Sequence, residues 1–207
     1  MGRRARYAEA QILEGARHVS AEIGPHKLTI AKVAERTGVP VGSIYHRYGS
    51  RDEILASVWL DLVEEFQEHF LSELEAADVV GGGLAGVRGA CEWIRHHPRE
   101  ARLLLLHRRE DFASDRWAPA YRRRAEALAT RAGASLSTYA VRLTGRRGPD
   151  ELRAVRFALV DLPMAALRRD VEAGTPPADG MLRLLLQTCA YALRHAARGQ
   201  SKRRTRR

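Results

Sequence analysis

Cysteine is scarce in this chain, which argues against a fold held together by disulfides. Only Cys91 and Cys189 occur among 207 residues, far apart and without CxxC spacing. Neither a structural disulfide nor a cysteine-based zinc site is expected from such a pair. We expect two small buried side chains, with a redox-sensing pair across a dimer as the alternative.

Long apolar runs are also missing. The longest pure-leucine stretch, Leu103 to Leu106, is far shorter than the roughly 18 to 20 residues that cross a bilayer. The N-terminal segment lacks the apolar core of a secretory signal. No HExxH motif, Gly-rich phosphate loop or nucleophile–base spacing indicates an enzyme. We therefore expect a cytoplasmic protein with no membrane partner, no cofactor and no catalytic activity.

Basic residues are in excess, and the excess lies at the two ends of the chain. Residues 1–51 hold nine Lys and Arg against four Asp and Glu, and residues 194–207 hold seven against none. The remainder holds 19 basic against 21 acidic residues. A near-neutral body with two basic ends favours a polyanionic partner, above all nucleic acid. Charge alone does not distinguish DNA from RNA or an anionic membrane.

Apolar residues recur at three- and four-residue steps along most of the chain, a spacing typical of amphipathic helices. No strand pattern of convincing length occurs. The helical pattern is interrupted at Gly81–Gly83, where we expect a flexible break, and at Pro163, where we expect a kink. Ser50 and Glu53 form a capping box that starts the clearest helix. The predicted fold class is all-α.

Residues 29–48 carry the pattern of a helix-turn-helix, in which apolar positions point inward at the spacing of two short packed helices. Thr29 is a good N-cap for the first of these helices. The second helix of such a pair enters the major groove of DNA. Its first residues, Val41, Gly42 and Ser43, are small and would allow close approach to the bases.

The polar residues that follow suit contacts with phosphates or bases. Tyr45, His46 and Arg47 supply a hydroxyl, an imidazole and a guanidinium group. A helical hairpin whose Tyr and Arg are merely solvated is the competing interpretation. The local excess of basic residues argues against it.

Residues 42–55, GSIYHRYGSRDEIL, resemble the signature of the tetracycline-repressor (TetR) family of transcriptional regulators. The shared order is a glycine, a small polar residue, an aliphatic, Tyr, two variable positions, an aromatic, two turn residues, a basic residue, an acidic pair and then leucine. The resemblance covers about residues 7–60. Arg51 is often Lys in the family and Tyr48 is more often Phe, and both changes keep the chemistry.

The resemblance implies a role for each matching residue. The implied DNA-binding set is Thr29, Val41, Gly42, Ser43, Tyr45, His46, Arg47 and Arg51. Within this set, Thr29, Tyr45 and Arg51 would hold phosphates, whereas the small residues and His46 would face base edges. Tyr48 would pack the domain together.

The resemblance also implies three parts of the chain. Residues 1–50 would form a three-helix DNA-binding domain, residues 51–198 a larger helical domain for ligand binding and dimerisation, and residues 199–207 would follow as a tail. The basic composition of residues 199–207 itself predicts a disordered, solvated end, with sequence-independent attraction to DNA as the alternative. The last two long helices, about 149–171 and 176–196, would build a homodimer. Such a dimer would bind near-palindromic double-stranded operator DNA.

The function implied is that of a repressor released from its operator by a small-molecule effector. A DNA-binding dimer controlled by a protein partner or by abundance is the alternative. No ligand-contacting residue can be transferred from the family. Aromatic and imidazole side chains of the central helices are candidates from their chemistry alone: Trp93, His97, His107, Trp117, Tyr121 and Phe157. Core or surface packing is the competing interpretation for each.

One group of residues raises the question of a metal. His107, Glu110 and Asp111 stand at i, i+3 and i+4, so that one helical face could present all three to a cation. The neighbouring Arg108 and Arg109 favour a solvated, salt-bridged face instead. No metal site is predicted.

Overall fold

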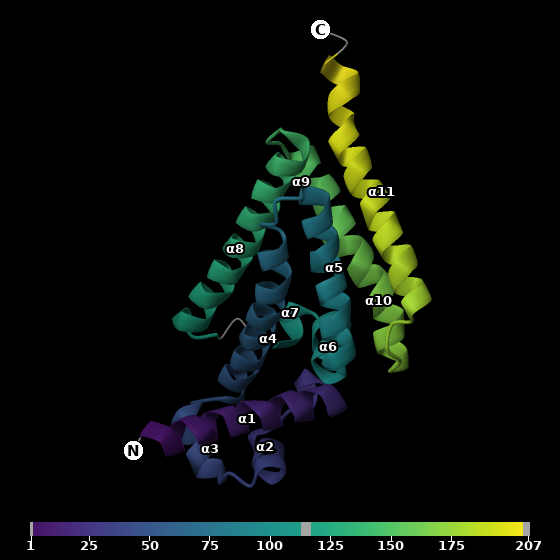
Figure 1. Ribbon diagram of the computed structural model, residues 1–207. Helices are drawn as coiled ribbons and strands as arrows, with labels where there is room; N and C mark the ends of the chain where they lie inside the picture. Colours follow the sequence, from purple (N-terminus) through teal and green to yellow (C-terminus); the bar gives the residue numbers. More distant parts are fainter. Residues whose placement is uncertain (1, 113–116, 205–207) are drawn as a thin grey trace. The chain divides into compact units, whose positions relative to one another are not determined.

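The computed structural model describes residues 2–112 and 117–204, with side chains described over 9–112 and 117–198. Every regular element in these ranges is helical, which confirms the all-α prediction (Figure 1). The elements are α1 (Gly2–Ile23), η1 (Pro25–Lys27), α2 (Ile30–Thr37), α3 (Val41–Arg47), α4 (Arg51–Glu73), α5 (Val79–His96), α6 (Pro98–Leu106), α7 (Arg109–Phe112), α8 (Pro119–Thr144), α9 (Pro149–Arg156), η2 (Phe157–Asp161), α10 (Leu162–Ala173) and α11 (Asp179–Arg204). None of the described helices combines the length and apolar character needed to span a bilayer.

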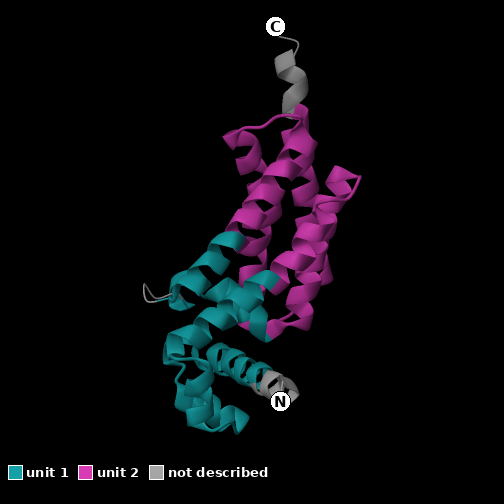
Figure 2. Ribbon diagram, turned by 90° about the vertical axis from the view of Figure 1, so that its left-hand side faces the viewer, with its two compact units in different colours: residues 1–64, 99–127 teal, residues 65–98, 128–207 magenta. Residues whose placement is uncertain are grey.

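Packing divides the chain into two compact units (Figure 2). Unit 1 comprises residues 1–64 and 99–127, and unit 2 comprises residues 65–98 and 128–207. Each unit is therefore built from two stretches of sequence, and the long helices α4 and α8 contribute to both.

Residue 50, where the sequence predicts a domain boundary, lies inside unit 1. The reason is that the first half of α4 packs with helices from much later in the chain. The ring of Trp59 lies 4.9 Å from that of Phe112 on α7, and Arg124 on α8 pairs with Asp61 at 2.8 Å. These contacts join the start of α4 to the segment 99–127 and extend the unit beyond the helix-turn-helix.

The N-terminal helices of unit 1 close around a small apolar core. Ile12 of α1, Val33 of α2 and Ile44 of α3 are almost fully buried. A glycine allows α1 and α2 to pack closely, because a Cβ on Gly15 would lie 2.2 Å from the methyl carbon of Thr37. Such a short pair of helices buries little surface alone, so α1 is needed to complete the core.

The glycine run in unit 2 is helical, and the predicted flexible break at Gly81–Gly83 is wrong. Helix α5 begins at Val79 and includes all three glycines. A Cβ on Gly82 would lie 2.5 Å from the carbonyl oxygen of Glu73, and one on Gly83 would lie 2.2 Å from the hydroxyl of Tyr139. Close packing against α4 and α8 thus accounts for Gly82 and Gly83, and all three glycines belong to a continuous helix.

The predicted kink at Pro163 corresponds to a π-helical turn. Helix α9 continues through η2 into α10 without a break, and Pro163 lies in the first turn of α10. Proline lacks an N–H and its ring crowds the carbonyl four residues earlier, here that of Leu159 within η2. The wider turn of a π-helix is one of the usual ways in which a helix accommodates such a residue.

Helix α11 continues to Arg204. Residues 199–204, which the sequence assigns to a disordered tail, therefore have a helical backbone. Residues 205–207 lie outside the described residues.

Candidate nucleic-acid interface

Helix α2 begins at a side-chain cap. Thr29 has an extended backbone, and its hydroxyl oxygen accepts a hydrogen bond from the backbone N–H of Lys32 at 3.3 Å. This satisfies one of the N–H groups that a helix start leaves without a partner. The hydroxyl proton of this exposed residue is still available to a phosphate oxygen placed at the helix start.

The turn between α2 and α3 is held by a small set of hydrogen bonds. Gly38 adopts a left-handed backbone, with φ of 71°, and its N–H donates to the carbonyl of Ala34 at 2.8 Å. The Thr37 hydroxyl donates to the carbonyl of Val33 at 2.7 Å and accepts from the N–H of Val39 at 3.2 Å. A positive φ favours glycine, so residue 38 determines where α3 starts.

Helix α3 has one buried side and one exposed side. Ile44 is fully buried and anchors the helix to the core. The exposed residues include five of the eight that the sequence assigned to DNA: Val41, Gly42, Ser43, Tyr45 and His46. A groove of about 440 Å³ runs beside them and is lined by Ile12, Val39, Gly42, Ser43, His46 and Arg47. The structure thus brings the expected base-facing residues together on one open surface.

Gly42 has no intramolecular role that the structure reveals. A Cβ at this position would meet no atom within 4 Å, and the residue lies in the first turn of a helix, where glycine costs at most roughly 0.5–1 kcal/mol relative to alanine. The backbone of Gly42 is therefore bare on the outer side of α3. Another molecule could approach this backbone more closely than it could approach an alanine.

Arg51 has a structural role that the sequence did not predict. Its guanidinium group donates to the carbonyl oxygens of Leu28 at 2.7 Å, Pro25 at 2.8 Å and His26 at 3.0 Å. It also pairs with Asp52 at 3.2 Å. These bonds use most of its N–H donors and tie the end of η1 to the start of α4. Arg51 positions α2 in this way, and few donors remain for a phosphate.

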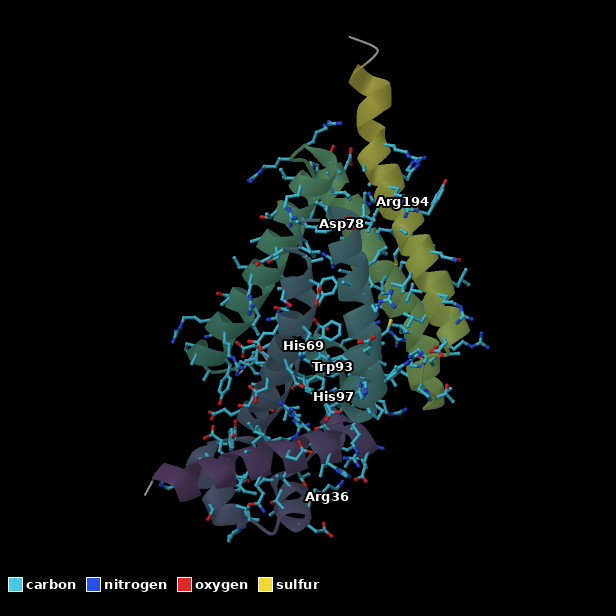
Figure 3. The ribbon with its side chains drawn as sticks, viewed as in Figure 1. Arg36, His69, Asp78, Trp93, His97 and Arg194 are labelled. Carbon is cyan, nitrogen blue, oxygen red and sulfur yellow. The ribbon has the colours of Figure 1, made fainter. Side chains whose placement is uncertain are left out.

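Two other basic side chains near the interface have acidic partners. Arg47 lies 3.3 Å from a carboxylate oxygen of Glu9 on α1. Arg36, labelled in Figure 3, pairs with Glu22 at 2.5 Å, and the hydrogen bond from Arg36 lowers the pKa of that carboxyl group. Both pairs are exposed enough to exchange partners, because surface ion pairs contribute only about 0–1 kcal/mol.

Tyr48 ends α3 and packs into the core, with 4% of its surface exposed. Its buried hydroxyl has no hydrogen-bond partner among the described residues. Burial raises the pKa of Tyr48 above its ordinary value, so the phenol is neutral at physiological pH. The ring thus stabilises the domain, whereas the hydroxyl contributes nothing that the structure shows.

Replacing Tyr48 with Phe is expected to stabilise the protein by about 1 kcal/mol, because it removes a buried polar group without a partner. The measurement is the free energy of unfolding in urea, compared between the two proteins at equal concentration. A loss of 1 kcal/mol or more would show that the hydroxyl has a hydrogen-bond partner, such as an ordered water.

The six candidate ligand residues fall into both units. Trp93 and His97 of unit 2 are labelled in Figure 3; their rings stack 5.0 Å apart, and Phe66 packs on Trp93 at 5.4 Å. The indole N–H of Trp93 points to Glu65 at 3.4 Å. Phe157, also in unit 2, is 53% exposed on η2. Its exposure gives no support to a position inside a pocket.

The other three candidates belong to unit 1. Trp117 is buried and its indole N–H donates to the carbonyl of Phe112 at 3.0 Å. The hydroxyl of Tyr121 lies 3.5 Å from that of Ser57. His107 lies edge-on to the ring of Phe112. Trp117 and His107 thus both contact Phe112, and these contacts account for their positions without a small-molecule effector.

The helical face predicted to carry His107, Glu110 and Asp111 does not exist as one face. Helix α6 ends at Leu106 and α7 starts at Arg109, so His107 lies in the connection between them. Asp111 is still close, with 3.6 Å between its carboxylate and Nδ1 of His107, but Glu110 is not part of the group. Its place is taken by His26 of η1, which sequence spacing could not reveal. Burial lowers the pKa of His107, which favours the neutral imidazole.

Comparison with known proteins relates the interface to a described family. Residues 12–58 match the family model "Bacterial regulatory proteins, tetR family". A stretch of 50 residues is 38% identical to the HTH-type transcriptional repressor AcnR of Corynebacterium jeikeium (strain K411). That stretch covers 24% of this chain and 26% of the repressor, so the match spans about a quarter of either protein.

The fold is similar over a much larger part of the chain. A TetR family transcription regulator from Marinobacter aquaeolei VT8 superposes with a TM-score of 0.71 and 14% identity, covering 93% of this chain and 98% of that one. The regulator FadR of Bacillus subtilis, solved in complex with stearoyl-CoA, superposes with a TM-score of 0.69 and 17% identity, covering 89% and 97%. Residues 12–58 therefore carry a DNA-binding segment of the TetR type, and the chain shares the fold of TetR family regulators along most of its length.

Proposed function

We propose that this protein is a transcriptional repressor that binds near-palindromic double-stranded DNA as a homodimer and is released by a small-molecule effector. The observation that carries the proposal is the outer side of α3, where Gly42 lies bare between Val41 and Ser43 and close to Tyr45 and His46. An α-helix with such a surface fits the major groove, with its first residues toward the bases. The proposal involves no catalysis, and it places the protein beside the chromosome in the cytoplasm.

The distribution of exposed apolar side chains supports a homodimer. The large apolar residues that the described part of the chain exposes are Val41, Tyr45, Phe157, Met181, Leu184 and Tyr191. The first two lie on the proposed DNA-binding surface, and the others lie on η2 and α11. Steps of three and seven residues place the three on α11 along one stripe of the helix. Exposed apolar stripes of this kind mark protein–protein contacts.

A two-fold dimer would present two copies of α3. Two such helices bind half-sites whose centres lie about 34–36 Å apart, or a multiple of that distance, so the operator is a near-palindrome. In vitro selection from random duplexes with the untagged protein should therefore recover an inverted repeat.

A small-molecule effector is supported by the fold and by one structural relative. FadR of Bacillus subtilis, which shares this fold, was solved with stearoyl-CoA. We therefore choose acyl-CoA thioesters of different chain lengths as the first compounds to test. A ligand of the native dimer raises its melting temperature, and an effector must also bind the DNA-free form more tightly than the DNA-bound form.

Substitutions on α3 test whether these residues face the bases. Ser43→Ala and His46→Ala should each change the preference for particular base pairs in the selected operator, by on the order of tenfold. The measurement is the affinity of each variant for a set of operators with single base-pair changes.

Tyr45→Phe provides the comparison, because a phosphate contact carries no sequence information. This variant should weaken binding to all operators in the set to a similar degree. If Ser43→Ala and His46→Ala behave in the same uniform way, the two side chains do not face bases.

A further inference from the structure

Three potential metal ligands from distant parts of the sequence meet in unit 1. His26 comes from η1, His107 from the connection between α6 and α7, and Asp111 from α7. Nδ1 of His26 lies 4.0 Å from one carboxylate oxygen of Asp111, and Nδ1 of His107 lies 3.6 Å from the other. The three residues offer ligand atoms that all lie within 4.8 Å of one another.

We propose that His26, His107 and Asp111 bind a divalent transition metal of the zinc class. Two imidazoles and a carboxylate are a donor set that such cations prefer. Zn–N and Zn–O bonds of about 2.0–2.1 Å place tetrahedral ligand atoms about 3.3–3.4 Å apart. The distances of 3.6 and 4.0 Å exceed this spacing by less than 1 Å, which side-chain rotations can supply. Water from solvent completes the coordination.

Two of the three ligands are held by a rigid frame. Asp111 accepts a hydrogen bond from the backbone N–H of Arg108 at 2.8 Å, which fixes its carboxylate at the start of α7. The ring of His107 packs edge-on against Phe112, with centroids 6.2 Å apart. Phe112 is almost fully buried, and the ring of Trp59 packs against it with centroids 4.9 Å apart. Ligands supported in this way lose little conformational freedom when a metal binds.

The third ligand has a backbone held by a hydrogen bond and an exposed side chain. The carbonyl oxygen of His26 accepts a hydrogen bond from Arg51, so the position of its Cα is set by the fold. Its imidazole is 63% exposed and can turn toward the other two ligands. A bound metal would tie η1, which directly precedes α2, to the segment between α6 and α7. The site does not depend on the proposed function, since none of its three ligands belongs to the implied DNA-binding set.

Zinc titration of the untagged full chain tests the proposal. After treatment with a chelator, the wild-type protein should take up one Zn²⁺ per chain in calorimetry and melt at a higher temperature with Zn²⁺ present. When Co²⁺ is bound in place of Zn²⁺, the complex should show the visible absorption bands of Co²⁺ in a low-symmetry site of nitrogen and oxygen ligands. Each of His26→Gln, His107→Gln and Asp111→Asn should weaken binding at least about tenfold. His26→Gln is the cleanest variant, because its side chain is exposed and its loss cannot disturb the core.

His18→Gln is the matched control. Its imidazole lies 3.2 Å from Glu22 on the surface of α1, a histidine–carboxylate pair outside any group of three ligands in the described chain. This variant should bind Zn²⁺ as the wild type does. The proposal is overturned if the wild type takes up no zinc, if His26→Gln titrates like the wild type, or if His18→Gln loses as much affinity as His26→Gln.

Discussion

Replacing Gly42 with alanine is expected to make the protein more stable and its DNA binding weaker. The added methyl group meets no atom within 4 Å, so the helix gains up to about 0.5–1 kcal/mol from the change in propensity. In a complex with DNA the same methyl would stand where α3 approaches the groove. Crowding of a packed contact costs about 1–3 kcal/mol, which corresponds to a loss of affinity on the order of 10- to 100-fold.

Gly133→Ala is the control for this substitution. Gly133 also lies inside a helix, α8, is exposed, and would place its Cβ in open space. This variant should gain similar stability and bind DNA as the wild type does. The two measurements are urea unfolding and affinity for the selected operator. If both variants gain stability and both keep full affinity, α3 does not approach DNA at Gly42.

The double substitution Leu184→Glu and Tyr191→Glu is expected to produce a folded monomer with little affinity for the operator. Both side chains are more than half exposed on α11, so their replacement leaves the core of unit 2 in place. Two carboxylates buried in a dimer interface would lack partners and would cost several kcal/mol. A monomer has one DNA-binding domain and lacks the gain in affinity that two linked domains provide, which is about 10²- to 10⁴-fold.

Light scattering and operator binding, measured on the same samples, test this expectation. Ala134→Glu adds one such carboxylate at an exposed site on α8, outside η2 and α11, and it should remain a dimer. A double variant that stays dimeric and binds DNA normally would place the interface on another surface.

Local features of the sequence predicted the helix-turn-helix well, because its geometry depends on neighbours in the chain. The cap at Thr29 and the left-handed turn at Gly38 each involve residues at most four positions away. The capping box at Ser50 and Glu53 was predicted less accurately than these two features. Ser50 accepts from the N–H of Glu53 at 3.2 Å, as predicted, but the Glu53 carboxylate accepts from Gly49, one residue before the expected partner.

Features that depend on distant residues could not be derived from local patterns. The local sequence around Gly83 predicts flexibility, whereas in the structure Gly83 packs against Tyr139, 56 positions later in the chain. Arg51 has a side chain that suits phosphate binding, yet its guanidinium group donates hydrogen bonds to the carbonyl oxygens of Leu28 and Pro25. His26 and His107 meet only because the fold brings η1 beside α7. In each case a tertiary contact decides the role, and single-sequence spacing contains no signal for it.

The salt dependence of binding to double-stranded DNA tests the central claim most directly. A protein that inserts two copies of α3 into the major groove must contact phosphates on either side and release their counterions. We predict that the affinity of the untagged protein for its selected operator falls by at least about 100-fold between roughly 50 and 200 mM salt. The absence of salt-sensitive affinity for any duplex, including the DNA upstream of its own gene, would contradict the account.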